Sequence, residues 1–449
     1  AINRPNRCKS MSLTALLFVL AFSTGCIFAL VRHPIYGLMT YVAVFYLHPP
    51  SRWWGQGLLY DIRWSLLAAA VTLLALMLRR GRPQTAPVFR SGLFWGLIGL
   101  ILWLTIQSLW ALDREAHFDQ LSIYMKLAIA IVMICKCIET ERHLRLFLWS
   151  HVVGCFYLGW LAFTSYTGGR LDGVGGPGID DANSGALQMV TGVFAASSLF
   201  LAGSYKARTI LLMMIPFMVN GLIATISRTG FLAVLVGGLA YNLLTPKKYR
   251  VRVFVLSILA ATLFGLLANN LYWERMGTIR YRGEDLPGID TGGGRLEIMR
   301  AQFEMFQLYP FGCGHMCTTV LSPQYLEDRF LSRGYRASHN TFMSMLVDHG
   351  IIGAVAYVLL AIWIVVSLRT IYRRCSECDD FLAISLPSLG SVLIAILVGD
   401  MFVQHVKFEA RFWFLALLLV QLQLSHSIAR RSLEQQTAHR ATTPIGASR

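Results

Sequence analysis

Long apolar runs, separated by short polar segments, fill most of the chain. The runs are 11–31, 35–46, 58–78, 91–112, 121–138, 144–163, 184–203, 210–226, 231–244, 253–268, 351–368, 381–398 and 412–424. A helix needs roughly 20 apolar residues to cross a bilayer. The pattern therefore predicts an all-α polytopic membrane protein. Residues 35–46 form a run too short to cross comfortably, so we expect this run to pair with its neighbour as a broken or re-entrant element.

Composition and charge narrow the class of protein. Hydrophobic residues make up 55% of the 449 residues and charged residues only 14%, which excludes a soluble globular domain. The formal net charge of +16 comes from Lys and Arg scattered among the loops rather than gathered in a basic domain. We therefore expect no nucleic-acid partner, and interpret the charge as a topology signal with affinity for membrane lipids and phosphates.

Lys and Arg concentrate in alternate loops between the apolar runs. These basic loops are 79–90, 136–145, 206–208, 247–252, 369–374 and the C-terminal tail. Because basic loops face the cytoplasm, the pattern predicts the side of each loop, and the basic N-terminus joins the cytoplasmic side. Two termini on one side require an even number of crossings. We predict about twelve transmembrane helices.

The expected organisation has five parts. They are a cytoplasmic N-terminal segment (1–10), an N-terminal transmembrane bundle (11–270), a long outer loop with short helices (271–350), C-terminal transmembrane helices (351–426) and a cytoplasmic tail (427–449). The long outer loop is rich in Arg, whose guanidinium group binds phosphate through two hydrogen bonds. We expect this loop to carry catalytic residues. Contact with lipid headgroups is the alternative for most of its arginines.

Arg228 lies between two apolar runs on the outer face. Residues 210–244 are too many for one crossing, so the chain must turn near 227–230. Two helices then hold Arg228 at the outer interface. There it serves either as a fixed cation for a lipid-linked phosphate or as a headgroup anchor.

His339 lies where the long outer loop meets the next apolar run. Phe342, Met343 and Leu346 follow it on one face of a helix, so His339 is expected at a helix start, pointing into the bundle. We expect Ser338 to cap this helix. The alternative is a packed histidine that bonds a backbone carbonyl.

Two other groups suggest chemistry. Cys313 and Cys317 are expected to pack in the loop as free thiols, with a metal site or a disulfide as alternatives.

Asp180 and Asp181, beside Asn183, suit either a divalent metal or a helix start, where such residues cap. We expect capping or substrate contact.

Three stretches resemble a known family when taken together. They are SRTG at 227–230, GGGRLEIMRAQFEMFQLYPFGCG at 292–314 and SHNTFMSMLVDHGIIG at 338–353. Their order resembles the O-antigen ligase/O-antigen polymerase superfamily, and LVRHPIYGLMTYVAVFYLHPPSRWW at 30–54 is similar to its exosortase-associated O-glycosylation ligase-like branch. The resemblance in motif order and spacing covers about residues 183–353.

The resemblance implies a multi-pass glycosyltransferase of the bacterial inner membrane. Its active site faces the periplasm and moves a glycan from undecaprenyl pyrophosphate to a hydroxyl, which in the ligases belongs to lipid A–core oligosaccharide. No cofactor is implied: no metal, nucleotide sugar or ATP. An O-antigen polymerase or a protein O-oligosaccharyltransferase shares the same site. A lipid-linked glycan transporter is a further alternative, disfavoured because the ionisable residues lie at span ends rather than at the midplane.

The resemblance also implies catalytic roles. Arg228 and Arg295 match the two arginine positions of the family and are expected to stabilise the leaving pyrophosphate. Arg300 is a weaker candidate for the same role. His339 is the expected general base, because a neutral imidazole can take a proton from a hydroxyl near neutral pH. Nearby positive charge should lower the pKa of His339.

The remaining substrate-binding candidates are Asn183, Ser227, Asn340 and Asp400. Asp400, at the outer end of a span, matches an acidic position of the family. It is expected to hold His339 or to bind the acceptor. Pairing with Lys407 or Arg411 is the alternative.

Overall fold

The protein is a bundle of helices. The computed structural model describes residues 12–57, 59–79, 88–176, 181–280, 294–331, 334–375 and 381–442, with side chains up to residue 426. Over these residues the regular secondary structure is helical, without β-strands. Together with the apolar spans below, this confirms the prediction of an all-α polytopic membrane protein.

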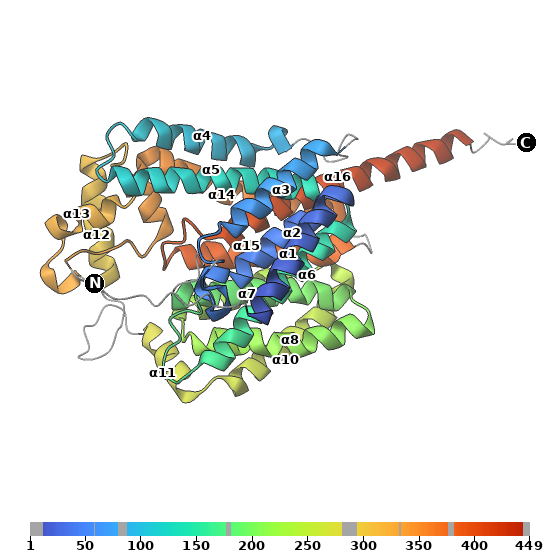
Figure 1. Cartoon of the computed structure of the whole chain (residues 1–449), viewed down its shortest axis with the longest axis horizontal. Coiled ribbons are helices and arrows are strands. Elements are labelled where there is room, and N and C mark those ends of the chain that lie inside the picture. Colours follow the sequence, from blue (N-terminus) through green and yellow to red (C-terminus); the bar gives the residue numbers. More distant parts are fainter. Residues whose placement is uncertain are drawn as a thin grey trace, which may run out of the picture.

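Sixteen α-helices follow one another along the described residues (Figure 1). They are α1 (Leu13–Val31), α2 (Ile35–Leu47), α3 (Trp64–Leu78), α4 (Gly92–Gln107), α5 (Arg114–Cys137), α6 (Glu141–Ser165), α7 (Ala182–Ala202), α8 (Tyr205–Ala224), α9 (Arg228–Leu244), α10 (Arg250–Leu267), α11 (Asn270–Gly277), α12 (Gly294–Leu308), α13 (Cys317–Tyr325), α14 (Thr341–Cys375), α15 (Phe381–Asp400) and α16 (Glu409–Thr442).

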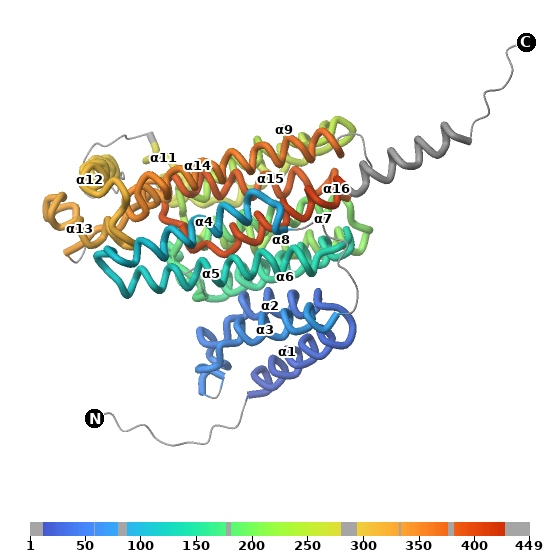
Figure 2. The backbone as a smooth tube through the Cα atoms, turned by 90° about the horizontal axis from the view of Figure 1, so that it is seen from above, coloured from blue at the N-terminus to red at the C-terminus, as the bar shows by residue number. Residues whose placement is uncertain are grey.

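The long helices lie side by side, so that the bundle has two ends (Figure 1). We call the end with α11, α12 and α13 the loop end, and the opposite end, with the turn between α5 and α6, the basic end. Helix α15 packs against α7, α9, α14 and α16 in the interior. Helices α1, α2 and α3 form a layer on one side, where α2 packs on α6 and α3 on α5 (Figure 2).

Eight helical segments within the described part are long and apolar enough to cross a membrane. They are α1, α5, α6, α7, α8, α10 together with the 3₁₀ turn before it, α14 and α15. Three shorter apolar helices, α3, α4 and α9, accompany them. The chain is therefore a membrane protein, while the number of twelve crossings stays a prediction.

Helix α2 is as short as the sequence predicted. Its 13 residues span about 20 Å at 1.5 Å per residue, less than the roughly 30 Å hydrocarbon core. His48 ends the helix in a left-handed conformation (φ 38°), and two 3₁₀ turns follow. The run is thus a short helix between α1 and α3.

The prediction that Cys313 and Cys317 are free thiols is wrong, because these residues form a disulfide. Their Cα atoms are 5.6 Å apart, a separation that a disulfide spans readily. Gly314 (φ 94°) and Met316 (φ 64°) turn the backbone between them. Residue spacing alone does not reveal these left-handed conformations, so the sequence did not favour the disulfide.

Helix α14 is broken near its start. Gly350 has φ 69° and ψ −162°, so residues 341–349 form a short helix that is distinct from the spanning part, 351–375. The break is fixed by the loop before α13, because the Ile351 N–H donates to the Pro310 carbonyl at 3.0 Å. Gln107 of α4 also binds the backbone here, since its side-chain amide donates to the Asp348 carbonyl at 2.8 Å.

Replacement of Gly350 by alanine should destabilise the protein by about 2–3 kcal/mol, because the left-handed backbone disfavours a Cβ. That Cβ would also lie 2.3 Å from the Phe311 carbonyl carbon. Thermal unfolding in detergent measures the effect. Gly238→Ala is the matched control, because Gly238 lies within α9 and has open space around its Cβ position. Equal unfolding temperatures for the two variants would contradict the assignment.

Candidate active site

His339 lies two residues before α14 and is half-buried. Asn340 caps the helix, because its side-chain oxygen accepts from the Met343 N–H at 3.0 Å. The prediction that Ser338 is the cap is therefore wrong. Ser338 folds back instead, and its hydroxyl accepts from the Asn340 N–H at 3.2 Å. Of the expected buried face, Met343 and Leu346 are buried, whereas Phe342 is 37% exposed.

Arg228 is the first residue of α9 and is half-buried. Its Nη1 donates to Thr278 Oγ1 at 3.1 Å, which connects α9 to the segment after α11. Ser227 caps α9 by accepting from the Gly230 N–H at 3.1 Å. The same hydroxyl donates to Asn183 Oδ1 at 2.7 Å. This bond joins the starts of α7 and α9, so the predicted residues Asn183 and Ser227 lie together beside Arg228.

Asp181 caps α7, as predicted, with its carboxylate accepting from the backbone N–H groups of Asn183 (2.8 Å) and Ser184 (3.1 Å). Its neighbour Asp180 lies outside the described residues. Its contacts therefore assign Asp181 to the helix start as a cap.

Arg295 and Arg300 lie on α12 but in different surroundings. Arg295 is half-buried, and its guanidinium group lies over the Phe402 ring, 5.8 Å from the centroid. Arg300 is exposed and pairs with Glu297 at 2.7 Å. The structure therefore brings Arg295 to the segment between α15 and α16, and leaves Arg300 on the surface of α12.

Residues 401–408, between α15 and α16, are the meeting point of the predicted segments; we call them the 401–408 turn. Phe402 in this turn supports Arg295 from α12. Its neighbour Met401 accepts through its carbonyl oxygen a 3.4 Å hydrogen bond from the side chain of Asn340. One short segment thus contacts both an expected phosphate-binding arginine and the residue that follows the expected base.

His405 connects the 401–408 turn to α7. Its Nε2 is 3.0 Å from Ser184 Oγ, and its backbone N–H donates to Thr341 Oγ1 at 2.9 Å. Burial and the nearby Arg411 charge lower the pKa of His405 to about 4, so the imidazole is neutral at physiological pH. His405 was not among the site residues predicted from the sequence. The available signal was a second ionisable group close to Asp400 in a short polar segment between two apolar runs.

Asp400 is buried, at 1% exposure, at the end of α15. One carboxylate oxygen accepts from Thr341 Oγ1 at 3.0 Å and from the Arg411 guanidinium group, and the other accepts from the Tyr357 hydroxyl at 2.8 Å. Pairing with Arg411, one of the alternatives from the sequence, is therefore what the structure contains. Through these bonds Asp400 fixes α14, which begins beside His339, against α15 and α16.

An apolar groove of about 410 Å³ lies between α4, α5, α14 and α16. Gly96 and Gly99 of α4 line it, and both have open space around their Cβ positions. Its lining also includes Tyr357 and Arg411, which bond Asp400. The groove thus extends from apolar helix surfaces to the Asp400 ion pair at the loop end.

Comparison with known proteins bears on this site directly. No curated protein matches the chain. Residues 212–358 match a family model described as O-antigen ligase. The matched segment contains Ser227, Arg228, Arg295, His339 and Asn340, and it supports the resemblance of this membrane protein to the O-antigen ligase superfamily.

Proposed function

We propose that this protein is an O-antigen ligase that works at the periplasmic face of the bacterial inner membrane without a metal cofactor. It moves a glycan from undecaprenyl pyrophosphate to a hydroxyl of lipid A–core oligosaccharide. The observation that carries the proposal is the 401–408 turn, which contacts both Arg295 and Asn340 within a chain that matches the O-antigen ligase model.

Arg228 and Arg295 are the proposed phosphate clamp. As the bond between the anomeric carbon and pyrophosphate breaks, negative charge grows on the departing diphosphate. Cations fixed in advance stabilise that transition state more than the ground state. The hydrogen bond from Arg228 to Thr278 and the stacking of Arg295 on Phe402 support this role, because both restrict how the guanidinium groups turn.

His339 is the proposed general base, which takes the proton from the acceptor hydroxyl as it attacks the anomeric carbon. Its place one residue before the Asn340 cap supports this role, because the cap fixes the backbone beside it. Asp400 is proposed as a positioning residue. Its bond to Thr341, the first residue of α14, holds the helix start next to His339.

The cysteines support the proposed sidedness. Disulfides persist in oxidising compartments such as the periplasm and are rare in the cytoplasm. The disulfide Cys313–Cys317 lies at the loop end. In contrast, Cys137, at the α5–α6 turn beside a basic loop, is a free thiol. We therefore assign the loop end to the periplasm and the basic end to the cytoplasm.

The groove beside Asp400 supports a lipid-linked donor. It is mostly apolar and reaches the Asp400 network, so it suits the hydrocarbon chain of a substrate whose phosphates lie at the loop end. An O-antigen polymerase and a protein O-oligosaccharyltransferase would use the same donor and differ in the acceptor. A transporter is the least favoured alternative, since it requires ionisable groups along a path through the midplane.

His339→Ala should lower glycan transfer by about 10²–10⁴-fold, the usual contribution of a general base. The assay mixes purified protein, lipid-linked glycan and lipid A–core, with EDTA and without nucleotide. His48→Asn is the control, because asparagine tolerates the left-handed backbone of that position. Full transfer by a folded His339→Ala protein that still binds donor would remove His339 as the base. Transfer to a second lipid-linked glycan instead of lipid A–core would identify a polymerase.

Arg228→Ala and Arg295→Ala should each lower turnover by about 10²–10³-fold, as expected when one transition-state donor is lost. The corresponding lysine variants should recover only part of the rate, because lysine keeps the charge but lacks the two-pronged guanidinium group. Arg329→Ala is the matched control, since Arg329 is an exposed arginine of the same loop paired with Glu327. A phosphate clamp would be refuted by equal rates for alanine and arginine at both positions.

Labelling with a membrane-impermeant thiol reagent should show that the loop end and the basic end face different compartments. Tyr335→Cys, an exposed position near His339, should be labelled in intact spheroplasts, and Lys248→Cys only after lysis. The parent chain gives the background from the native cysteines. Labelling of both positions in the same compartment would contradict the proposed sidedness.

A further inference from the structure

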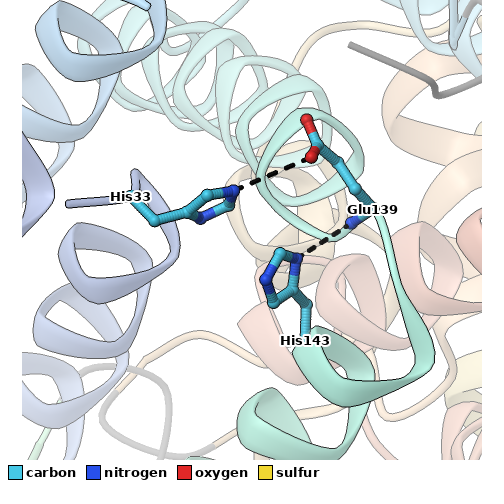
Figure 3. A group of neighbouring side chains, drawn as sticks. All are labelled: His33, Glu139 and His143. Atoms are coloured by element: carbon cyan, nitrogen blue, oxygen red, sulfur yellow. Dashed lines mark hydrogen bonds and ion pairs between the residues drawn. The ribbon is translucent and has the colours of Figure 1, made fainter.

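A cluster of metal-ligating side chains lies at the basic end, away from the proposed active site. Figure 3 shows His33, Glu139 and His143 converging from three segments. His33 comes from the turn between α1 and α2, Glu139 from the turn between α5 and α6, and His143 from the first turn of α6. The cluster therefore connects the layer of α1, α2 and α3 to the main bundle.

The separations within the cluster are close to those that one ion requires. One ligand atom from each residue lies within 4.8 Å of the other two. His33 Nε2 is 3.7 Å from Glu139 Oε2, and the two imidazole centroids are 4.4 Å apart. Zn²⁺ binds nitrogen and carboxylate oxygen at about 2.0–2.2 Å, so small side-chain movements would bring the three atoms around a single centre.

The polar groups of the cluster are incompletely satisfied. His33 Nε2 is buried and has no hydrogen-bond partner among the described residues, because Glu139 Oε2 lies 3.7 Å away. Burial and the nearby Arg79 charge lower the pKa of His33, which favours the neutral imidazole that binds a metal. Arg79 also donates to both carboxylate oxygens of Glu139 and fixes its orientation.

We propose that His33, Glu139 and His143 bind one Zn²⁺ ion at the basic end, with water as the fourth ligand. Two histidines and one carboxylate with an open fourth position form a ligand set that zinc favours. Arg79 holds the Glu139 carboxylate from outside, as partners of ligating carboxylates do. The ion joins the α1–α2 turn to the α5–α6 turn.

The hydrogen bonds of the His33 and His143 imidazoles show where each ring proton lies before and after Zn²⁺ binds. His143 Nδ1 accepts only a long 3.4 Å contact from the Glu139 N–H, so its lone pair is available. His33 Nδ1 accepts from the Ile35 N–H at 3.1 Å, which leaves the ring proton on Nε2. Binding through Nε2 moves that proton to Nδ1 and breaks the bond to Ile35. The lost hydrogen bond and the positive charge of Arg79 both weaken Zn²⁺ binding, so we expect a micromolar rather than a nanomolar dissociation constant.

The test uses full-length protein in detergent, stripped with a chelator and titrated with Zn²⁺ and with Co²⁺. We expect one bound ion per chain, a tetrahedral Co²⁺ absorption spectrum and a higher unfolding temperature with Zn²⁺. His33→Ala, His143→Ala and Glu139→Gln should each weaken Zn²⁺ binding by at least about tenfold and abolish the temperature shift. His426→Ala removes an exposed histidine from α16 and should change neither.

Two outcomes would overturn the proposal. One is no binding by the unmodified protein at about 100 µM Zn²⁺, well above the expected micromolar range. The other is unchanged affinity and Co²⁺ spectrum in a folded His33→Ala/His143→Ala protein. If the alanine variants fail to fold, loss of the Co²⁺ spectrum in His33→Gln and His143→Gln decides the matter. The result is separate from the proposed function, whose transfer assay runs in EDTA.

Discussion

The ion pair of Asp400 with Arg411 is the interaction on which the loop end depends. Both side chains are buried, at 1% and 6% exposure, where an unpaired charge costs about 3–5 kcal/mol. Asp400 therefore holds α16 through Arg411 and α14 through Tyr357 and Thr341. The 401–408 turn is closed between these fixed ends, and Arg295 and Asn340 contact that turn.

Much of this arrangement was predictable from local sequence. Apolar runs predicted the positions of the long apolar helices, and the excess of 210–244 over one crossing located the turn at Arg228. The cap at Asp181 followed from residue type, because a short acidic side chain before a helix satisfies its first N–H groups.

Features that depend on tertiary contact were not predictable. The disulfide requires left-handed backbone at Gly314 and Met316, which only the packed loop imposes. His405 acquires its place from Ser184 on a distant helix, and nothing in its neighbours specifies that contact. Asn340 rather than Ser338 is the cap, because α14 begins two residues later than the sequence suggested. Each difference reflects geometry set by residues remote in the chain.

The break at Gly350 has a mechanical consequence. It divides α14 into a short piece that follows His339 and a long piece, residues 351–375, on which Val355, Leu359 and Ile362 are exposed. The short piece is anchored to Gln107 and to the disulfide-closed loop through backbone bonds at Asp348. A thicker or thinner bilayer changes the tilt of a spanning helix. Because Gly350 separates the two pieces, a change in the tilt of residues 351–375 need not turn the short piece beside His339 by the same angle.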